Sequence, residues 1–223
     1  MARLDAVLWD MDGTLLDSEK LWDMALRELA AEMGHELTDA IRHALIGASG
    51  PNAMRILFAG LGVEATPQAT TAAADWIEER VTELFHGPIP WRPGAQDVLA
   101  GLRAAGVPMA LVTNTKRSLT ELALNTLGRD NFHATVCADE VEHGKPAPDL
   151  YLRAAELLGV APEHAVAIED SPTGSLAAEA AGCTLLVVPC EIAVPEGPGR
   201  VFRDSLIGLT HTELSGLRAA RAS

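Results

Sequence analysis

Between residues 93 and 188 the sequence alternates between short apolar segments and longer amphipathic ones. The amphipathic segments are typical of helices, and several of them end at a glycine. This alternation predicts right-handed crossovers and a parallel sheet covered by helices on both faces, so we expect an α/β doubly wound fold. The apolar segments, which are typical of buried strands, are VPMALV, ATVCA, AVAIE and TLLVV.

A further apolar segment, AVLW, lies at residues 6–9 and fits the same sheet. The residues that follow it are helical in pattern, with Thr38, Pro51 and Pro67 at the expected helix starts. We therefore predict a core domain made of residues 1–15 and 88–223, into which a helical cap domain, residues 16–87, is inserted.

The segment after the last predicted strand, residues 189–209, is rich in proline and glycine. These residues are typical of turns and irregular structure. We expect an ordered surface loop here, followed by a short last helix.

Composition excludes several classes of function. The chain has 223 residues, of which 48% are hydrophobic, which is ample for a packed interior. Its formal net charge of −14 does not suit a nucleic-acid partner. The N-terminal sequence has no apolar run long enough for a signal peptide or a membrane span, which predicts a cytosolic protein with no membrane partner. Cys137, Cys183 and Cys190 show no metal-ligand spacing, so we expect reduced thiols.

Polar side chains follow several of the predicted strands. A single residue of this kind commonly caps the next helix, but these would converge at the carboxyl edge of the sheet, where α/β proteins bind ligands. Independent caps would not be expected to combine two acidic clusters with a hydroxyl and a lysine. The residues are Asp10, Asp12, Thr113, Asn114, Lys145, Glu169 and Asp170.

Four of these residues are acidic, and burying their charges together without compensation would cost several kcal/mol each. A hard divalent cation such as Mg²⁺ relieves the repulsion and leaves room for a phosphate oxygen. Lys145 and the hydroxyl of Thr113 would bind the remaining phosphate oxygens. The sequence thus predicts Mg²⁺ as cofactor and a small phosphorylated metabolite as partner.

Asp10 and Asp12 are two residues apart, which suits covalent phosphoryl transfer. One carboxylate would attack phosphorus and form an aspartyl-phosphate, while the other would protonate the leaving alcohol and then take a proton from water. The attacking group has to be ionised, whereas the acid has to keep its proton at the first step.

At these residues the sequence resembles the haloacid dehalogenase superfamily, in particular its phosphatases with a helical cap after the first strand. The resemblance implies that Asp10 is the nucleophile, and that Asp12 is the acid/base and a metal ligand through its backbone carbonyl. It implies Asp170 as a metal ligand, with Glu169 either joining it or lying behind it, and Thr113 and Lys145 as phosphate ligands supported by Asn114. The segments that carry it, in chain order, are DMDGT, VTNT, HGKPAPD and IEDSPTG.

Related chemistries can be compared with this interpretation. Asp12 argues against a dehalogenase, because displacing a halide needs no proton donor. The absence of lysine from residues 21–85 argues against phosphonate-cleaving relatives, which use a cap lysine. The β-phosphoglucomutases usually carry a histidine about where Trp22 stands and an arginine about where IGASGP runs, so a phosphatase is favoured and a mutase stays the alternative.

A non-enzymatic phospho-acceptor module, similar to response-regulator receivers, is an alternative from another class. The acid/base residue two positions after Asp10 and the large helical insert oppose it. The substrate of a phosphatase would be a small phosphomonoester such as a sugar or polyol phosphate, selected by cap residues such as Ser49, Asn52 and Arg55. We expect a monomer or a small homo-oligomer.

Overall fold

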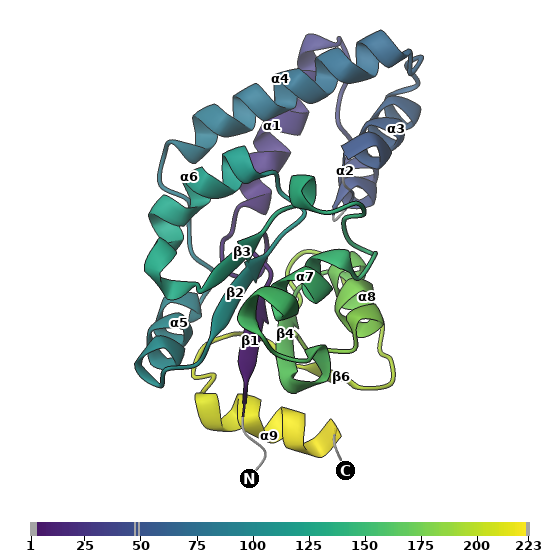
Figure 1. Cartoon of the computed structure of the whole chain (residues 1–223). Coiled ribbons are helices and arrows are strands. Elements are labelled where there is room, and N and C mark those ends of the chain that lie inside the picture. The colour runs from purple at the N-terminus through teal and green to yellow at the C-terminus, as the bar shows by residue number, and fades with distance from the viewer. Residues whose placement is uncertain (1–3, 47, 49, 222–223) are drawn as a thin grey trace. The chain divides into compact units, whose positions relative to one another are not determined.

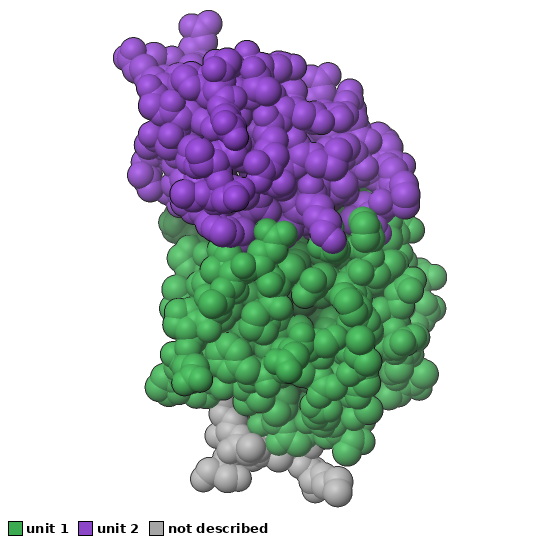
Figure 2. All heavy atoms as spheres, turned by 180° about the vertical axis from the view of Figure 1, so that it is seen from behind, with its two compact units in different colours: residues 1–17, 90–223 green, residues 18–89 purple. Residues whose placement is uncertain are grey.

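The computed structural model describes residues 4–46, 48 and 50–221. The chain divides into two compact units, coloured separately in Figure 2: unit 1 contains residues 1–17 and 90–223, and unit 2 contains residues 18–89. The predicted division into a core domain and a cap domain that acts on it stays a prediction.

Unit 1 is built on a parallel sheet with the strand order β3-β2-β1-β4-β5-β6 (Figure 1). Every residue of β1, β2 and β4 is buried, as expected for strands covered on both faces. The strands are β1 Ala6–Trp9, β2 Met109–Val112, β3 Ala134–Val136, β4 Ala165–Glu169, β5 Thr184–Val187 and β6 Arg200–Phe202.

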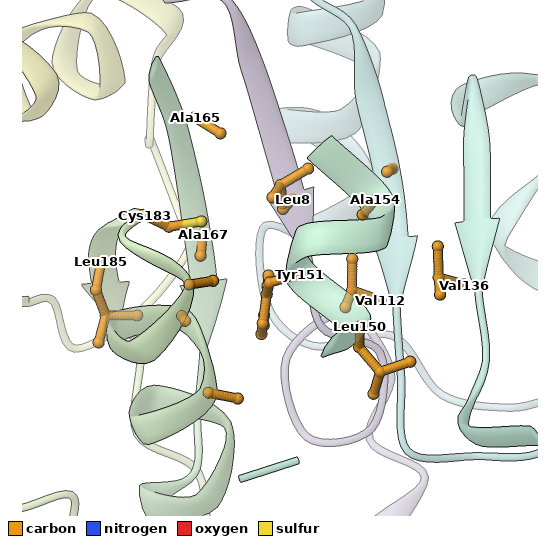
Figure 3. Close-up of a cluster of buried hydrophobic side chains, with 14 of the residues drawn as sticks. Leu8, Val112, Val136, Leu150, Tyr151, Ala154, Ala165, Ala167, Cys183 and Leu185 are labelled. Atoms are coloured by element: carbon orange, nitrogen blue, oxygen red, sulfur yellow. The ribbon is translucent and has the colours of Figure 1, made fainter. Parts of the chain in front are cut away.

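Helices α7 and α8 pack on the same face of this sheet. Figure 3 shows part of the buried cluster that they form with it, in which Leu150 and Tyr151 of α7 lie among side chains such as Leu8 and Val112. The chain moves from β1 to β2 and β3 in one direction across the sheet, and from β4 to β5 in the opposite direction. Because crossovers between parallel strands are right-handed, this reversal places α5 and α6 on the face opposite α7 and α8. The helices of unit 1 are α5 Ala95–Ala104, α6 Arg117–Leu127, α7 Asp149–Leu158, α8 Pro172–Ala181 and α9 His211–Arg221, with short 3₁₀ turns η1 Arg129–Asn131, η2 Ala138–Glu140 and η3 Pro162–His164.

The strand order reverses direction between β1 and β4, which creates a topological switch point. Trp9 of β1 is paired with Ile168 of β4, and the backbone N–H of Asp10 donates to the carbonyl of Ile168 at 3.1 Å. This register carries Asp10 to a position beside Glu169, the last residue of β4. The sheet therefore delivers two carboxylates to the place where ligands bind in folds of this class.

The prediction that residues 189–209 form only a loop is wrong, because β6 lies within them. This edge strand has three residues, pairs only with β5 among the described residues, and leaves Val201 and Phe202 exposed. Its first residue, Arg200, is anchored by Nε and Nη2, which donate to the two carboxylate oxygens of Glu179 at 2.6 and 2.8 Å. A short strand held in this way has no apolar run that the sequence pattern could reveal.

Unit 2 contains the first four of the helices that lie between β1 and β2 in the chain. The side chains of Thr38 and Thr66 accept hydrogen bonds from the backbone N–H of Ile41 and Ala69, so they cap α2 and α4, which start where the sequence predicts. The helices are α1 Glu19–Glu32, α2 Asp39–Leu45, α3 Gly50–Leu61 and α4 Pro67–Phe85.

Side chains of α1 hold this unit together through aromatic and ionic contacts. The ring of Trp22 packs edge-on against Phe85 of α4, with 6.3 Å between ring centroids. The buried guanidinium of Arg42 donates to Glu19 and Asp23, at 3.0 Å in each case. No helix among the described residues of either unit is long and apolar enough to cross a membrane.

Candidate active site

The structure brings Asp10, Glu169 and Asp170 together at the carboxyl edge of the sheet. Each offers a carboxylate oxygen, and these oxygens lie within 4.8 Å of one another. All three side chains are buried, and Glu169 is completely inaccessible to solvent. Three of the four acidic residues predicted to cluster thus form a group that could hold a metal ion, and the carboxylate of Asp12 is not part of this group.

Lys145 lies inside this cluster. Its Nζ donates to Asp10 Oδ1 and Glu169 Oε1, both at 2.6 Å, and to the carbonyl of Val112 at 2.9 Å. Burial acts to lower the pKa of Lys145, but the carboxylates of Asp10 and Glu169 raise it above its usual range, so the ammonium stays charged. Since a lysine has three donors, all of them are in use, and a phosphate oxygen would have to replace one of these acceptors.

Asp10 has two oxygens in different environments. Oδ1 accepts from Lys145, whereas Oδ2 is buried and has no hydrogen-bond partner among the described residues. Burial and the charge of Glu169 raise the pKa of Asp10 to about 7, although Lys145 acts against them. An orphaned carboxylate oxygen within a set of oxygen donors fits a hard divalent cation, which would favour the ionised form of Asp10.

Asp12 is held by two threonines that follow β2. Its Oδ2 accepts from the hydroxyl of Thr115 at 2.7 Å and from that of Thr113 at 3.3 Å, and the hydroxyl of Thr113 also accepts from the backbone N–H of Thr115. In this structure the Thr113 hydroxyl therefore binds Asp12, and its predicted contact with phosphate stays a prediction. Thr115 was not predicted as a site residue, although it stands within the segment VTNT.

Asn114 clasps the loop that carries Lys145. Its Oδ1 accepts from the backbone N–H of Lys145 at 2.8 Å, and its Nδ2 donates to the Lys145 carbonyl at 3.2 Å. A Cβ at Gly144 would lie 2.7 Å from the same Oδ1, so this loop needs a glycine for the close approach. Both ends of the Asn114 amide are thus occupied by protein, and its support of phosphate binding stays a prediction.

Asp170 approaches the loop after β1. The hydroxyl of Thr14 donates to Asp170 Oδ1 at 3.3 Å. Gly13 has a φ of +84°, and a Cβ at this position would collide with the carboxylate of Asp170. The glycine of DMDGT therefore has both a conformational and a steric reason to be there.

Two residues around Glu169 were not predicted from the sequence. The hydroxyl of Tyr151 donates to Glu169 Oε1 at 2.5 Å, and burial together with the charge of Glu169 raises the pKa of Tyr151 well above its usual value, so the hydroxyl keeps its proton. Gly174, in the first turn of α8, has no Cβ because one would overlap the Glu169 carboxylate. From the sequence alone, Tyr151 is only a residue of the amphipathic segment between the predicted strands ATVCA and AVAIE.

The substitution Gly174→Ala is expected to destabilise the fold and reduce activity. The new Cβ would displace the Glu169 carboxylate from its contacts with Lys145 and Tyr151, and overpacking of this kind costs about 1–3 kcal/mol. Urea unfolding and turnover of a phosphomonoester would measure the two effects. The matched control is Gly101→Ala in α5, where a Cβ meets nothing within 4 Å and should stabilise the helix; equal stability of the Gly174→Ala variant and the parent protein would contradict this packing.

The candidate specificity residues belong to unit 2. Asn52 and Arg55 are exposed on α3, where Nη2 of Arg55 donates to Oδ1 of Asn52 at 2.9 Å. Ser49 lies outside the described residues. A role for any of them in choosing the substrate stays a prediction.

Comparison with known proteins places this site in a family. The profile of the haloacid dehalogenase-like hydrolases matches residues 4–182. Hexitol phosphatase A of Escherichia coli is 33% identical over 205 residues, which are 86% of this chain and 87% of the relative. A phosphorylated carbohydrates phosphatase of Thermotoga maritima is 30% identical over 180 residues, or 80% of this chain and 82% of the relative.

A solved structure supports the same assignment. CbbY from Rhodobacter sphaeroides, crystallised as a mutant with xylulose-(1,5)bisphosphate, superposes with a TM-score of 0.84 at 29% identity, covering 95% of this chain and 99% of that one. The predicted fold class, with a helical insert between β1 and β2, is confirmed. The chain belongs to the haloacid dehalogenase-like hydrolases, as its motifs predict, and within them it is a phosphatase.

Proposed function

We propose that this phosphatase hydrolyses a small sugar or polyol phosphate through an aspartyl-phosphate formed on Asp10. The observation that carries the proposal is the environment of Asp10, which lies at the switch point of the sheet. Its Oδ1 accepts a hydrogen bond from Lys145, while its buried Oδ2 has no hydrogen-bond partner among the described residues. The relatives named above act on phosphorylated hexitols and carbohydrates, which supports a substrate of this class.

The residues suited to hold Mg²⁺ are Asp10, Glu169, Asp170 and the backbone carbonyl of Asp12. Their oxygens are the ligand type that this ion prefers, and each of the three carboxylates offers one oxygen that lies within 4.8 Å of those of the other two. When bound, the ion would offset the negative charge of the carboxylates and of the phosphate oxygens. Lys145 adds a permanent positive charge on the other oxygen of Asp10.

The residues then divide the chemistry between them. Asp10 attacks phosphorus, the bond from phosphorus to the ester oxygen breaks, and Asp12 gives its proton to the departing alcohol. In the second step water attacks phosphorus, its proton passes to Asp12, and phosphate leaves with Asp10 restored. Thr113 and Thr115 hold Oδ2 of Asp12, which fixes the plane of the carboxyl group during both steps.

Two alternatives make different predictions. A sugar-phosphate mutase would need basic cap residues. Trp22 stands about where β-phosphoglucomutases usually carry a histidine, and its ring packs against Phe85 within unit 2. A phospho-acceptor module would be phosphorylated once and would not turn over.

A cytosolic location, and a monomer or small homo-oligomer, stay predictions from the sequence.

The proposed function is tested with a panel of sugar, polyol and other metabolite phosphates. We expect repeated release of inorganic phosphate with Mg²⁺ present, fastest on one or a few sugar or polyol phosphates. A parallel assay on hexose 1-phosphates should give phosphate rather than hexose 6-phosphate. Conversion to the 6-phosphate would identify a mutase, and a single equivalent of bound phosphoryl group would identify a receiver-like module.

A further inference from the structure

Tyr151 contacts both charged groups that accompany Asp10, yet the proposed mechanism gives it no task. It is completely buried on α7, its hydroxyl is 2.5 Å from Glu169 Oε1, and the Lys145 ammonium lies 5.2 Å from the centroid of its ring. A phenylalanine would fill nearly the same volume in the apolar cluster of Figure 3. The presence of the hydroxyl therefore needs an explanation other than packing.

The hydroxyl acts on one particular oxygen of Glu169. Oε1 receives two short hydrogen bonds, from Tyr151 and from Lys145 Nζ at 2.6 Å, whereas Oε2 has a longer contact with the hydroxyl of Ser171 at 3.4 Å. Two donors that converge on one oxygen fix the rotation of the carboxylate. Oε2 is therefore the oxygen of Glu169 with the weaker contacts to the described residues.

The aromatic ring of Tyr151 acts on Lys145, the other charged group that accompanies Asp10. An ammonium close to an aromatic face is stabilised by the ring quadrupole, so Tyr151 also favours the observed place of Lys145 between Asp10 and Glu169. Helix α7 starts at Asp149, shortly after Lys145 in the chain, and therefore couples the lysine loop to the end of β4. One side chain thus restrains both groups that flank Asp10.

We propose that Tyr151 is a positioning residue that orients Glu169 for a divalent cation and keeps Lys145 on Asp10. Its hydroxyl bonds to Glu169 rather than to Asp10, so its effect passes through Glu169 and Lys145. This inference rests on the proposed function and adds to it a determinant of metal affinity. Partners that lie behind metal ligands commonly contribute about 10- to 100-fold to metal binding.

The variant Tyr151→Phe tests the hydroxyl alone. We expect the Mg²⁺ concentration for half-maximal activity to rise by about 10- to 100-fold, while KM for the phosphate substrate at saturating Mg²⁺ stays at the parent value. Titration calorimetry with Mg²⁺ should show the same loss without any substrate. A merely structural role would lower the unfolding temperature but leave the Mg²⁺ dependence unchanged, and that result would overturn the proposal.

The control is Thr184→Val, which removes a buried hydroxyl from strand β5. Thr184 Oγ1 has no hydrogen-bond partner among the described residues, so its loss should leave Mg²⁺ binding at the parent level. If the parent protein binds Mg²⁺ but hydrolyses no phosphomonoester, the proposed function fails, and the calorimetric comparison with the Tyr151→Phe variant still decides the role of Tyr151.

A second measurement needs no substitution at Tyr151. The chain contains one tyrosine, so biosynthetic fluorotyrosine would give a single fluorine NMR signal from this site. We expect Mg²⁺ to shift this signal in the parent protein, and to leave it unchanged in Asp170→Asn, where a proposed ligand is removed. A signal that does not respond to saturating Mg²⁺ in the parent protein would contradict the proposal, even if the Tyr151→Phe variant failed to fold.

Discussion

The substitution Asp10→Asn is expected to lower phosphomonoester turnover by roughly 10⁴-fold or more, because an amide cannot attack phosphorus. Steady-state release of inorganic phosphate from the preferred substrate would measure the loss. The matched control is Asp130→Asn, at an exposed position of the same unit, which should keep parent activity. Turnover near the parent level in the Asp10→Asn variant would remove Asp10 as the nucleophile.

The same substitution should leave the fold intact, which separates lost chemistry from lost structure. Burial raises the pKa of Asp10 to about 7 from its ordinary value of 3.8, so folding favours the protonated form and ionisation costs stability as pH rises through this interval. Without metal, the Asp10→Asn variant should therefore be at least as stable as the parent near pH 8, with a smaller difference near pH 5. Thermal unfolding in EDTA at the two pH values checks the sign.

Removing divalent cations with EDTA is expected to abolish activity, and added Mg²⁺ should restore it. The cluster of Asp10, Glu169 and Asp170 contains three carboxylates, and the ammonium of Lys145 pairs with two of them, Asp10 and Glu169, so an ionised Asp10 needs further positive charge. Activity assays before and after chelation measure this effect. Full turnover in EDTA would contradict a metal site.

The free energy of unfolding should also increase when Mg²⁺ binds. A ligand that binds only the folded state adds about 2.7 kcal/mol at 100 times its Kd, so Mg²⁺ should raise the unfolding midpoint of the parent protein. The increase should be much smaller in Asp170→Asn. An equal increase in both proteins would mean that the ion binds elsewhere.

The sheet was predictable because its central strands are buried on both faces. A strand such as AVAIE, covered by helices on each side, has to be apolar along most of its length, and this leaves a pattern that the sequence shows. The edge strand β6 has no such requirement, since Val201 and Phe202 are exposed and its anchor is the ion pair of Arg200 with Glu179. A contact between side chains far apart in the sequence leaves no periodic signal.

The same distinction applies to the site. Asp10, Glu169 and Asp170 could be placed together because each comes at the carboxyl end of a parallel strand, and such ends share one edge. The roles of Tyr151 and Thr115 depend on where a hydroxyl points, which the sequence pattern does not determine.

The central claim is that Asp10 takes the phosphoryl group, and acid quenching during turnover tests it most directly. The enzyme would be mixed with its preferred substrate and Mg²⁺, quenched in acid, cleaved with trypsin and analysed by mass spectrometry. The peptide of residues 4–20, which contains DMDGT, should gain one phosphoryl group located on Asp10. A phosphoryl group found only on another residue, or rapid turnover with no modified peptide at any quench time, would contradict the account.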